Sequence, residues 1–216
     1  MKFSKTLLVT AIAALAPIAS HASSITSNPT LAIGGLTFDN FTCSISKGGV
    51  YATPSHCDQI KVNTINEPGN GIQITSSFLA APLSFDDAAL TYDVSSAAGI
   101  KSVGLDFNGT FEGLAVSSVT ESVFNGDQLV GFAKVSCDLA GCNETDDISL
   151  NGVYNNLHIE KDIQTAAFLG TASSSIIDQT FCQAPEPGSI ALMGIGLLGA
   201  GTLLRRRTRR ALRNKQ

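Results

Sequence analysis

Residues 113–135 read GLAVSSVTESVFNGDQLVGFAKV and give a clear structural signal. Apolar and polar residues alternate through 113–124 and again through 128–135, which is the period of a strand with one face in a core. Asn125-Gly126 lies between the two halves, and this dipeptide readily adopts the positive φ angles of a tight hairpin turn. The stretch therefore predicts an antiparallel β-hairpin.

Similar patterns continue on both sides of this hairpin. Turn-forming residues punctuate them, including two further Asn-Gly pairs at Asn108-Gly109 and Asn151-Gly152. Many short strands at roughly ten-residue spacing are typical of an all-β, antiparallel β-sandwich or a jelly-roll-like domain. We interpret 80–89, which is rich in alanine and carries Pro82, as a loop. The other expected strands are 36–45, 60–65, 72–78, 90–94, 100–107, 147–150, 153–161 and 173–181.

The N-terminus has the three parts of a secretory signal peptide. Lys2 and Lys5 form a basic region, and 7–19 is an apolar stretch. Ser20-His21-Ala22 supplies the small residues that signal peptidase reads. We therefore expect cleavage between Ala22 and Ser23, a signal peptide at 1–22 and an exported domain at 23–183.

The C-terminal end joins an extended peptide to an apolar stretch and a basic cluster. The tripeptide Pro185-Glu186-Pro187 is kept out of any helix, because proline lacks an amide hydrogen and restricts the residue before it. Residues 189–204 carry no charge and would span about 24 Å as a helix, enough for a single transmembrane helix in a thin bilayer. A short basic flank remains in the cytoplasm, so the domain should lie outside it. The flank begins with Arg205, Arg206, Arg207, Arg209 and Arg210.

These three parts, in this order at the C-terminus, resemble the PEP-CTERM sorting signal. The resemblance covers 184–210, with the motif at 185–187, the span at 189–204 and a basic tail at 205–216. It implies an exosortase, a membrane enzyme that recognises and cleaves at the motif. It further implies a Gram-negative-type bacterium in which the chain is first anchored transiently in the inner membrane. The mature protein would then reach the cell surface or the exopolysaccharide matrix. The alternative is an ordinary C-terminal membrane anchor.

The exported domain is strongly acidic. Residues 23–183 contain five lysines against seventeen aspartates and glutamates, a formal net charge of −12. Such a surface repels nucleic acid and anionic lipid, so neither is an expected partner.

Five cysteines in an exported chain indicate an oxidising compartment. Two bridges among five thiols allow fifteen arrangements, so the sequence does not fix the pairing. Proximity favours Cys43 with Cys57 and Cys137 with Cys142, which leaves Cys182 unpaired, bonded to a second chain, or in place of one of these partners. A zinc site is the alternative to disulfide bonds, but Cys137 and Cys142 lack a second ligand pair at suitable spacing.

We find no motif for catalysis and expect a protein that is not an enzyme. His56 and His158 are the histidines outside the signal peptide, and neither lies in a nucleophile or base motif. Asp86-Asp87 and Asp146-Asp147 are interpreted as solvated acids at loop ends. We expect no cofactor, with calcium as the alternative, because hard cations favour oxygen ligands that cluster in one expected loop. Those candidate ligands are Asp138, Asn143, Glu144, Asp146 and Asp147.

Three functions remain open. The first is an exported, non-enzymatic surface or matrix protein, associated with exopolysaccharide and biofilm and processed by signal peptidase and exosortase. The second is a calcium-dependent adhesin or self-assembling surface subunit, and the third is a secreted hydrolase. Sugars stack on exposed aromatic rings, for which the sequence offers Tyr51, Tyr92 and Tyr154. The eleven phenylalanines are expected in the core.

Overall fold

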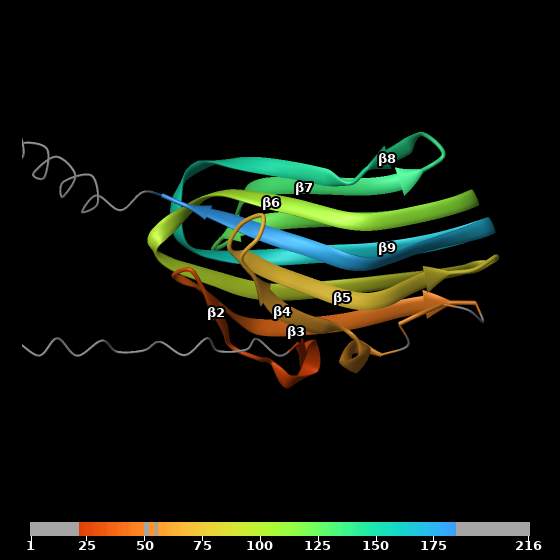
Figure 1. Ribbon diagram of the computed structural model, residues 1–216, viewed down its shortest axis with the longest axis horizontal. Coiled ribbons are helices and arrows are strands. Elements are labelled where there is room, and N and C mark those ends of the chain that lie inside the picture. Colours follow the sequence, from red (N-terminus) through yellow and green to blue (C-terminus); the bar gives the residue numbers. More distant parts are fainter. Residues whose placement is uncertain (1–21, 50–51, 55, 185–216) are drawn as a thin grey trace, which may run out of the picture.

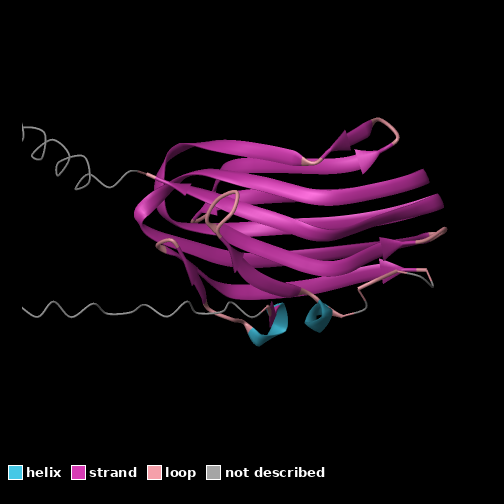
Figure 2. Cartoon of the chain, viewed as in Figure 1, coloured by secondary structure: helices cyan, strands magenta, loops and turns pink. Residues whose placement is uncertain are grey.

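The computed structural model describes residues 22–49, 52–54 and 56–184, which form strands and two short 3-10 helices (Figures 1 and 2). All strand pairs in this part of the chain are antiparallel, which confirms the predicted all-β class. The elements are β1 (Ser23–Ser24), η1 (Ile25–Ser27), β2 (Leu31–Ile33), β3 (Leu36–Gly48), η2 (Cys57–Gln59), β4 (Lys61–Ile65), β5 (Gly71–Ala80), β6 (Ser84–Asn125), β7 (Gln128–Asp138), β8 (Gly141–Asn143) and β9 (Thr145–Gln183).

The strands form a two-layered β-sandwich in which β6 and β9 each pass through both layers. The hydrogen-bonded ladder is therefore continuous from one layer to the other. In the layer that we call the front sheet, the order is β2, β3, 84–96 of β6, 156–167 of β9, 115–125 of β6, β7 and β8. In the back sheet, the order is β1, β4, β5, 171–183 of β9, 100–112 of β6 and 145–149 of β9.

Glycines allow β6 and β9 to turn from one sheet into the other at the same end of the sandwich. Gly113 in β6 and Gly170 in β9 are paired, and both have positive φ angles, 68° and 139°. A Cβ atom at either position would collide with a backbone carbonyl oxygen, of Leu169 or of Glu112. A side chain is excluded at this corner, so the bend depends on glycine.

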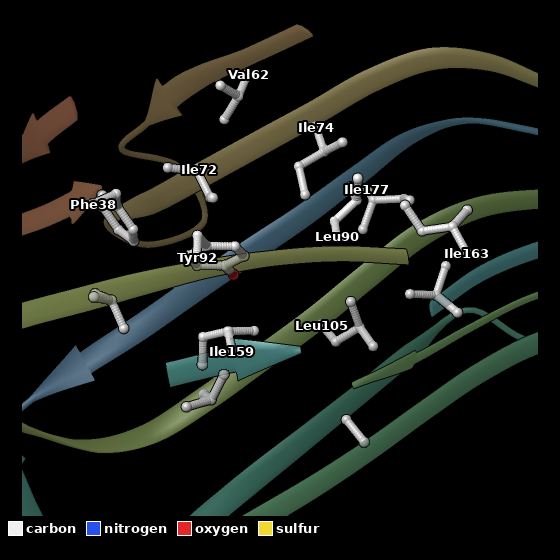
Figure 3. Packing of buried hydrophobic residues seen from close by; sticks show 14 of the residues in the cluster. Phe38, Val62, Ile72, Ile74, Leu90, Tyr92, Leu105, Ile159, Ile163 and Ile177 are labelled. Atoms are coloured by element: carbon white, nitrogen blue, oxygen red, sulfur yellow. The ribbon is translucent and has the colours of Figure 1, made fainter. Parts of the chain in front are cut away.

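The core lies between the sheets and follows from the period-two pattern. Inward positions of β6 in the front sheet, such as Leu90, Tyr92 and Val94, are buried, and they pack with Ile72 and Ile177 of the back sheet (Figure 3). Each such side chain contributes about 1.5–3 kcal/mol when it is fully buried.

Two turns that we predicted from Asn-Gly pairs do not form. Asn108-Gly109 lies inside β6 and Asn151-Gly152 inside β9, whereas Asn125-Gly126 does form the β6–β7 hairpin. At Gly109 the absent side chain makes room for the ring of Phe107. Asn108 Oδ1 accepts hydrogen bonds from the backbone of Ser175 and Ile176 at an irregularity in the ladder.

The predicted loop at 80–89 is also wrong. A turn occupies 81–83, and β6 begins at Ser84. Ser84 and Asp86 point inward and Phe85 points outward. Because small and polar residues occupy these core positions, the sequence lacks the apolar–polar alternation that would have predicted a strand. Asp86 is therefore buried rather than solvated, and burial raises its pKa to about 6.

Two disulfides join pairs that are close in sequence. Cys43 of β3 is bonded to Cys57 of η2, and Cys137 of β7 to Cys142 of β8, the pairs that proximity favoured. Cys182 is free and exposed.

The chain's two predicted signals lie largely outside the described residues. They include 1–21, the motif 185–187, the span 189–204 and the basic tail 205–216. Among the residues that the structure describes, no helix is long and apolar enough to cross a membrane. Cleavage between Ala22 and Ser23 stays a prediction, and Ser23 is the first residue of β1, paired with Val62.

A buried ionic network connects the two sheets through the core. Lys161 and Glu121 are opposite each other in the front sheet, where the Lys161 ammonium contacts the Glu121 carboxylate and Gln179 Oε1 of the back sheet. Gln179 Nε2 donates to Gly104 O at 2.9 Å and to Glu121 Oε1 at 3.1 Å. Burial lowers the pKa of Lys161, and the charge of Glu121 opposes that shift. Removing one partner would leave the other charge buried without a counterion.

Lys161→Met should therefore destabilise the protein by about 3–5 kcal/mol, because Glu121 would keep a buried charge without a counterion. Lys161→Met combined with Glu121→Leu should recover more than half of that loss. Urea unfolding monitored by circular dichroism measures both values. A double variant as unstable as the single one would contradict the ionic explanation.

Candidate functional site

The solvent-facing side of the front sheet carries ordered rows of polar side chains. Register and alternation place Asp87, Gln164, Ser118 and Ser136 side by side in one row. The next rows contain Ala89, Asp162, Thr120 and Lys134, then Thr91, Glu160, Ser122 and Phe132, then Asp93, His158 and Phe124. We call this surface, from Asp87 to Asp93 along β6, the polar face.

The last row contains a hydrogen-bonded network. His158 Nδ1 lies 2.6 Å from Asp93 Oδ1, and Asn40 Nδ2 donates to Asp93 Oδ2 at 2.8 Å. Asn40 reaches this position from β3 because the ladder shifts register between Asp39 and Thr42, where Asn40 has a φ of 55°. Both carboxylate oxygens of Asp93 are thus engaged, which fixes the carboxylate for recognition.

Two hollows extend the polar face at this end. The first, of about 430 Å³, is lined by Asn40, Asp93, Asn125, Asn156 and His158 among others. The second, of about 390 Å³, shares Ser95 and Asn156 with the first and adds Thr37, Ser96 and Asn155. Amides and hydroxyls predominate, and each can both donate and accept hydrogen bonds.

A pair of carboxyl groups lies nearer the middle of the polar face. Asp87 and Asp162 occupy adjacent rows of neighbouring strands. Burial, the hydrogen bond with Asp87 and the charge of Asp87 together raise the pKa of Asp162 to about 6. Two carboxyl groups in contact favour sharing one proton.

Aromatic side chains do not lie where we expected them. Tyr92 is fully buried, Tyr154 is half-buried with its hydroxyl bonded to Asn151, and Tyr51 lies outside the described residues. Three phenylalanines that we assigned to the core are instead exposed: Phe85 at 42%, Phe132 at 56% and Phe168 at 63%. Phe132 belongs to the polar face. Its position in the alternating pattern of 128–135 places it on the outer side of the strand. We assigned it to the core because it is a phenylalanine.

Four of the five calcium candidates lie on strands, and Glu144 lies between β8 and β9. Asp138 is in β7, Asn143 in β8, and Asp146 and Asp147 are in β9. Asp138 accepts a hydrogen bond from the backbone of Ala140, and Asp146 accepts one from Lys134 N. Successive strand residues face opposite sides, so Asp146 and Asp147 diverge.

Asp147 instead approaches acids of the back sheet. Burial raises the pKa of Asp106, and the charges of Asp147 and Asp178 raise it further. Glu144 is also grouped with Cys137 and Cys142 among the described residues. Because those two sulfurs are bonded to each other, neither is a thiolate ligand for zinc.

Comparison with solved structures finds carbohydrate-binding modules. TmCBM61 in complex with β-1,4-galactotriose is 13% identical, with a TM-score of 0.35, covering 65% of this chain and 88% of that one. Module CBM36 with calcium and xylotriose is 14% identical at a TM-score of 0.27, covering 65% and 99%. A family 11 module from Clostridium thermocellum is 11% identical at 0.25, covering 72% and 92%.

Asp87→Asn should lower the pKa of Asp162 from about 6, because the introduced amide would donate a hydrogen bond to the ionised carboxylate of Asp162. Carboxyl-carbon nuclear magnetic resonance titration measures the midpoint. Asp86→Asn is the control, since Asp86 points into the core and should leave the Asp162 midpoint unchanged. A midpoint still near 6 in Asp87→Asn would refute the shared proton.

The C-terminal segment has a clear family match, whereas no curated protein matches the chain. Residues 183–210 match the model of the PEP-CTERM protein-sorting motif, which confirms the resemblance seen in the sequence. The chain therefore carries a PEP-CTERM sorting signal, which indicates an exported protein that is sorted by an exosortase.

Proposed function

We propose that this is a non-enzymatic protein of the cell surface or extracellular matrix, where its polar face binds exopolysaccharide after exosortase cleavage. The sorting motif supports delivery to the outside of the cell. The observation that carries the binding proposal is the polar face itself. Its four rows offer hydroxyl, amide and carboxyl groups on adjacent strands. Together the rows extend about 20 Å along the strand direction.

The chemistry of this face suits the hydroxyl groups of a sugar chain. Sugar hydroxyls both donate and accept, and the face offers acceptors at Asp93 and donors and acceptors at Gln164 and Ser118. The exposed ring of Phe132 lies within the same rows and offers an apolar surface for the face of a sugar ring.

The carboxyl groups on this face favour binding over hydrolysis. Glycosidases hold their two carboxyl groups about 5–10 Å apart, to leave room for the scissile bond and water. Asp87 and Asp162 are instead hydrogen-bonded to each other, and Asp93 has both oxygens engaged. This arrangement supports a binding surface.

A calcium-dependent adhesin is the second candidate. One observation favours it, the position of Asp147 and Asp178 beside Asp106 on the back sheet, where a divalent cation would offset the repulsion on Asp106. Calcium-dependent self-association, reversed by a chelator and lost in Asp147→Asn, would support this candidate over the first.

Single substitutions on the polar face should weaken binding to exopolysaccharide of the producing bacterium. Asn40→Ala and Phe132→Ala should each weaken it about three- to tenfold, as expected for the loss of one hydrogen bond or one ring contact. Affinity electrophoresis in gels containing the polymer, with and without calcium, measures the retention.

The matched control is Ile176→Ala, which removes an exposed apolar side chain from the back sheet. Its retention should equal that of the unchanged protein. Equal retention of all variants, or no retention of the unchanged protein, would overturn the proposed binding surface.

A further inference from the structure

An apolar groove of about 740 Å³ lies at one end of the front sheet. It is open and directly continues the outer side on which the polar face lies, since Phe85, Ala166 and Val116 form the row next to Asp87, Gln164 and Ser118. We define the apolar groove by Leu83, Phe85, Leu114, Val116, Leu139 and Phe168.

Several large apolar side chains in the walls of this groove are mostly exposed to solvent. Leu83 and Leu139 are each 69% exposed, and Phe168 is 63% exposed. Contiguous exposed apolar side chains mark a binding surface, because exposing them to water is unfavourable. The one charged side chain that lines the groove, Asp138, already accepts a hydrogen bond from Ala140.

Two local devices hold these side chains in place. Leu139 lies at the turn between β7 and β8, which the Cys137–Cys142 disulfide closes. Leu83 has a φ of 59°, a left-handed conformation that costs a leucine about 1–2 kcal/mol and a glycine almost nothing. Because the Leu83 side chain is 69% exposed, its burial in the domain offsets little of this cost, which favours a role in binding.

A lipid bilayer is a poor occupant for the groove. The segment 171–183 of β9 runs away from the groove for about 40 Å and ends at Gln183 at the opposite end, as the positions of the β7–β8 hairpin and the β9 arrowhead show (Figure 1). The described chain therefore leaves the domain at the end opposite the groove. The acidic domain also repels anionic lipid.

We infer that the apolar groove takes an alkyl or acyl chain attached to a saccharide, so that the ligand of the polar face is an acylated glycan. This inference rests on the proposed function. Its support is the continuity of the two surfaces on the same three strands, which present an apolar end and then rows of hydrogen-bonding groups. The volume also lies within the range of sites for small ligands.

Isothermal titration of the full chain with three neutral probes, below their micelle concentrations, tests the inference. Octyl β-glucoside should bind at least about tenfold more tightly than methyl β-glucoside, and each two carbons removed from the chain should weaken binding about three- to tenfold. Octyl tetraethylene glycol, which has the chain without the sugar, should bind more weakly than octyl β-glucoside.

Variants separate the groove from the polar face. Leu139→Ser and Phe168→Ser should remove the advantage of octyl over methyl β-glucoside, and Phe132→Ala should retain it. Leu83→Gly should weaken binding of octyl β-glucoside while keeping or raising the urea midpoint, because glycine relieves the strain. A lowered urea midpoint with unchanged binding would overturn the role of Leu83.

The outcomes distinguish this inference from the proposed function. Equal affinity for octyl and methyl β-glucoside would overturn the groove assignment and leave polymer binding standing. Equal affinity for octyl β-glucoside and octyl tetraethylene glycol would overturn the saccharide part and count against the proposed function. A dimer by light scattering that Leu139→Ser converts to monomers would overturn the inference in favour of a second copy.

Discussion

Pairing between β6 and β9 joins the two sheets of the domain into one continuous ladder. The two strands are hydrogen-bonded in both sheets, and their paired corner at Gly113 and Gly170 carries the ladder from one layer to the other. The register of this pairing brings Lys161 opposite Glu121, and Gln179 reaches them from the back sheet. A shift of one residue would move this charge network to the solvent side and expose the core.

The same register creates the outer surface of the front sheet. Because inward positions are filled by the core, the outward residues of β6, β7 and β9 form uninterrupted rows. The rows change in chemistry along the strands, from apolar near Phe85 to amide and carboxyl groups near Asp93. A ligand with one apolar end and a hydroxylated body would match this gradient along its length.

Local sequence signals predicted the parts of the fold that depend on neighbours in the chain. Asn125-Gly126 formed its hairpin, and residues 183–210 matched the sorting motif. Asn108-Gly109 instead lies inside β6, where Gly109 is paired with Ser174 of β9 and leaves room for the ring of Phe107. The local sequence reveals neither of these contacts.

The candidate site was hidden from sequence reasoning for a related reason. Its residues come from β3, β6, β7 and β9 and meet through register alone, so Asn40 and His158 gave no motif. Phe132 was assigned to the core from its residue type, although alternation placed it outside.

Release by an exosortase is the claim on which a matrix function rests. The direct measurement is the intact mass of the protein from membrane and extracellular fractions, in a host with an exosortase and in one without it. We expect a released form that ends near 185–187 in the first host alone. An unprocessed protein held in the membrane of both hosts would contradict it.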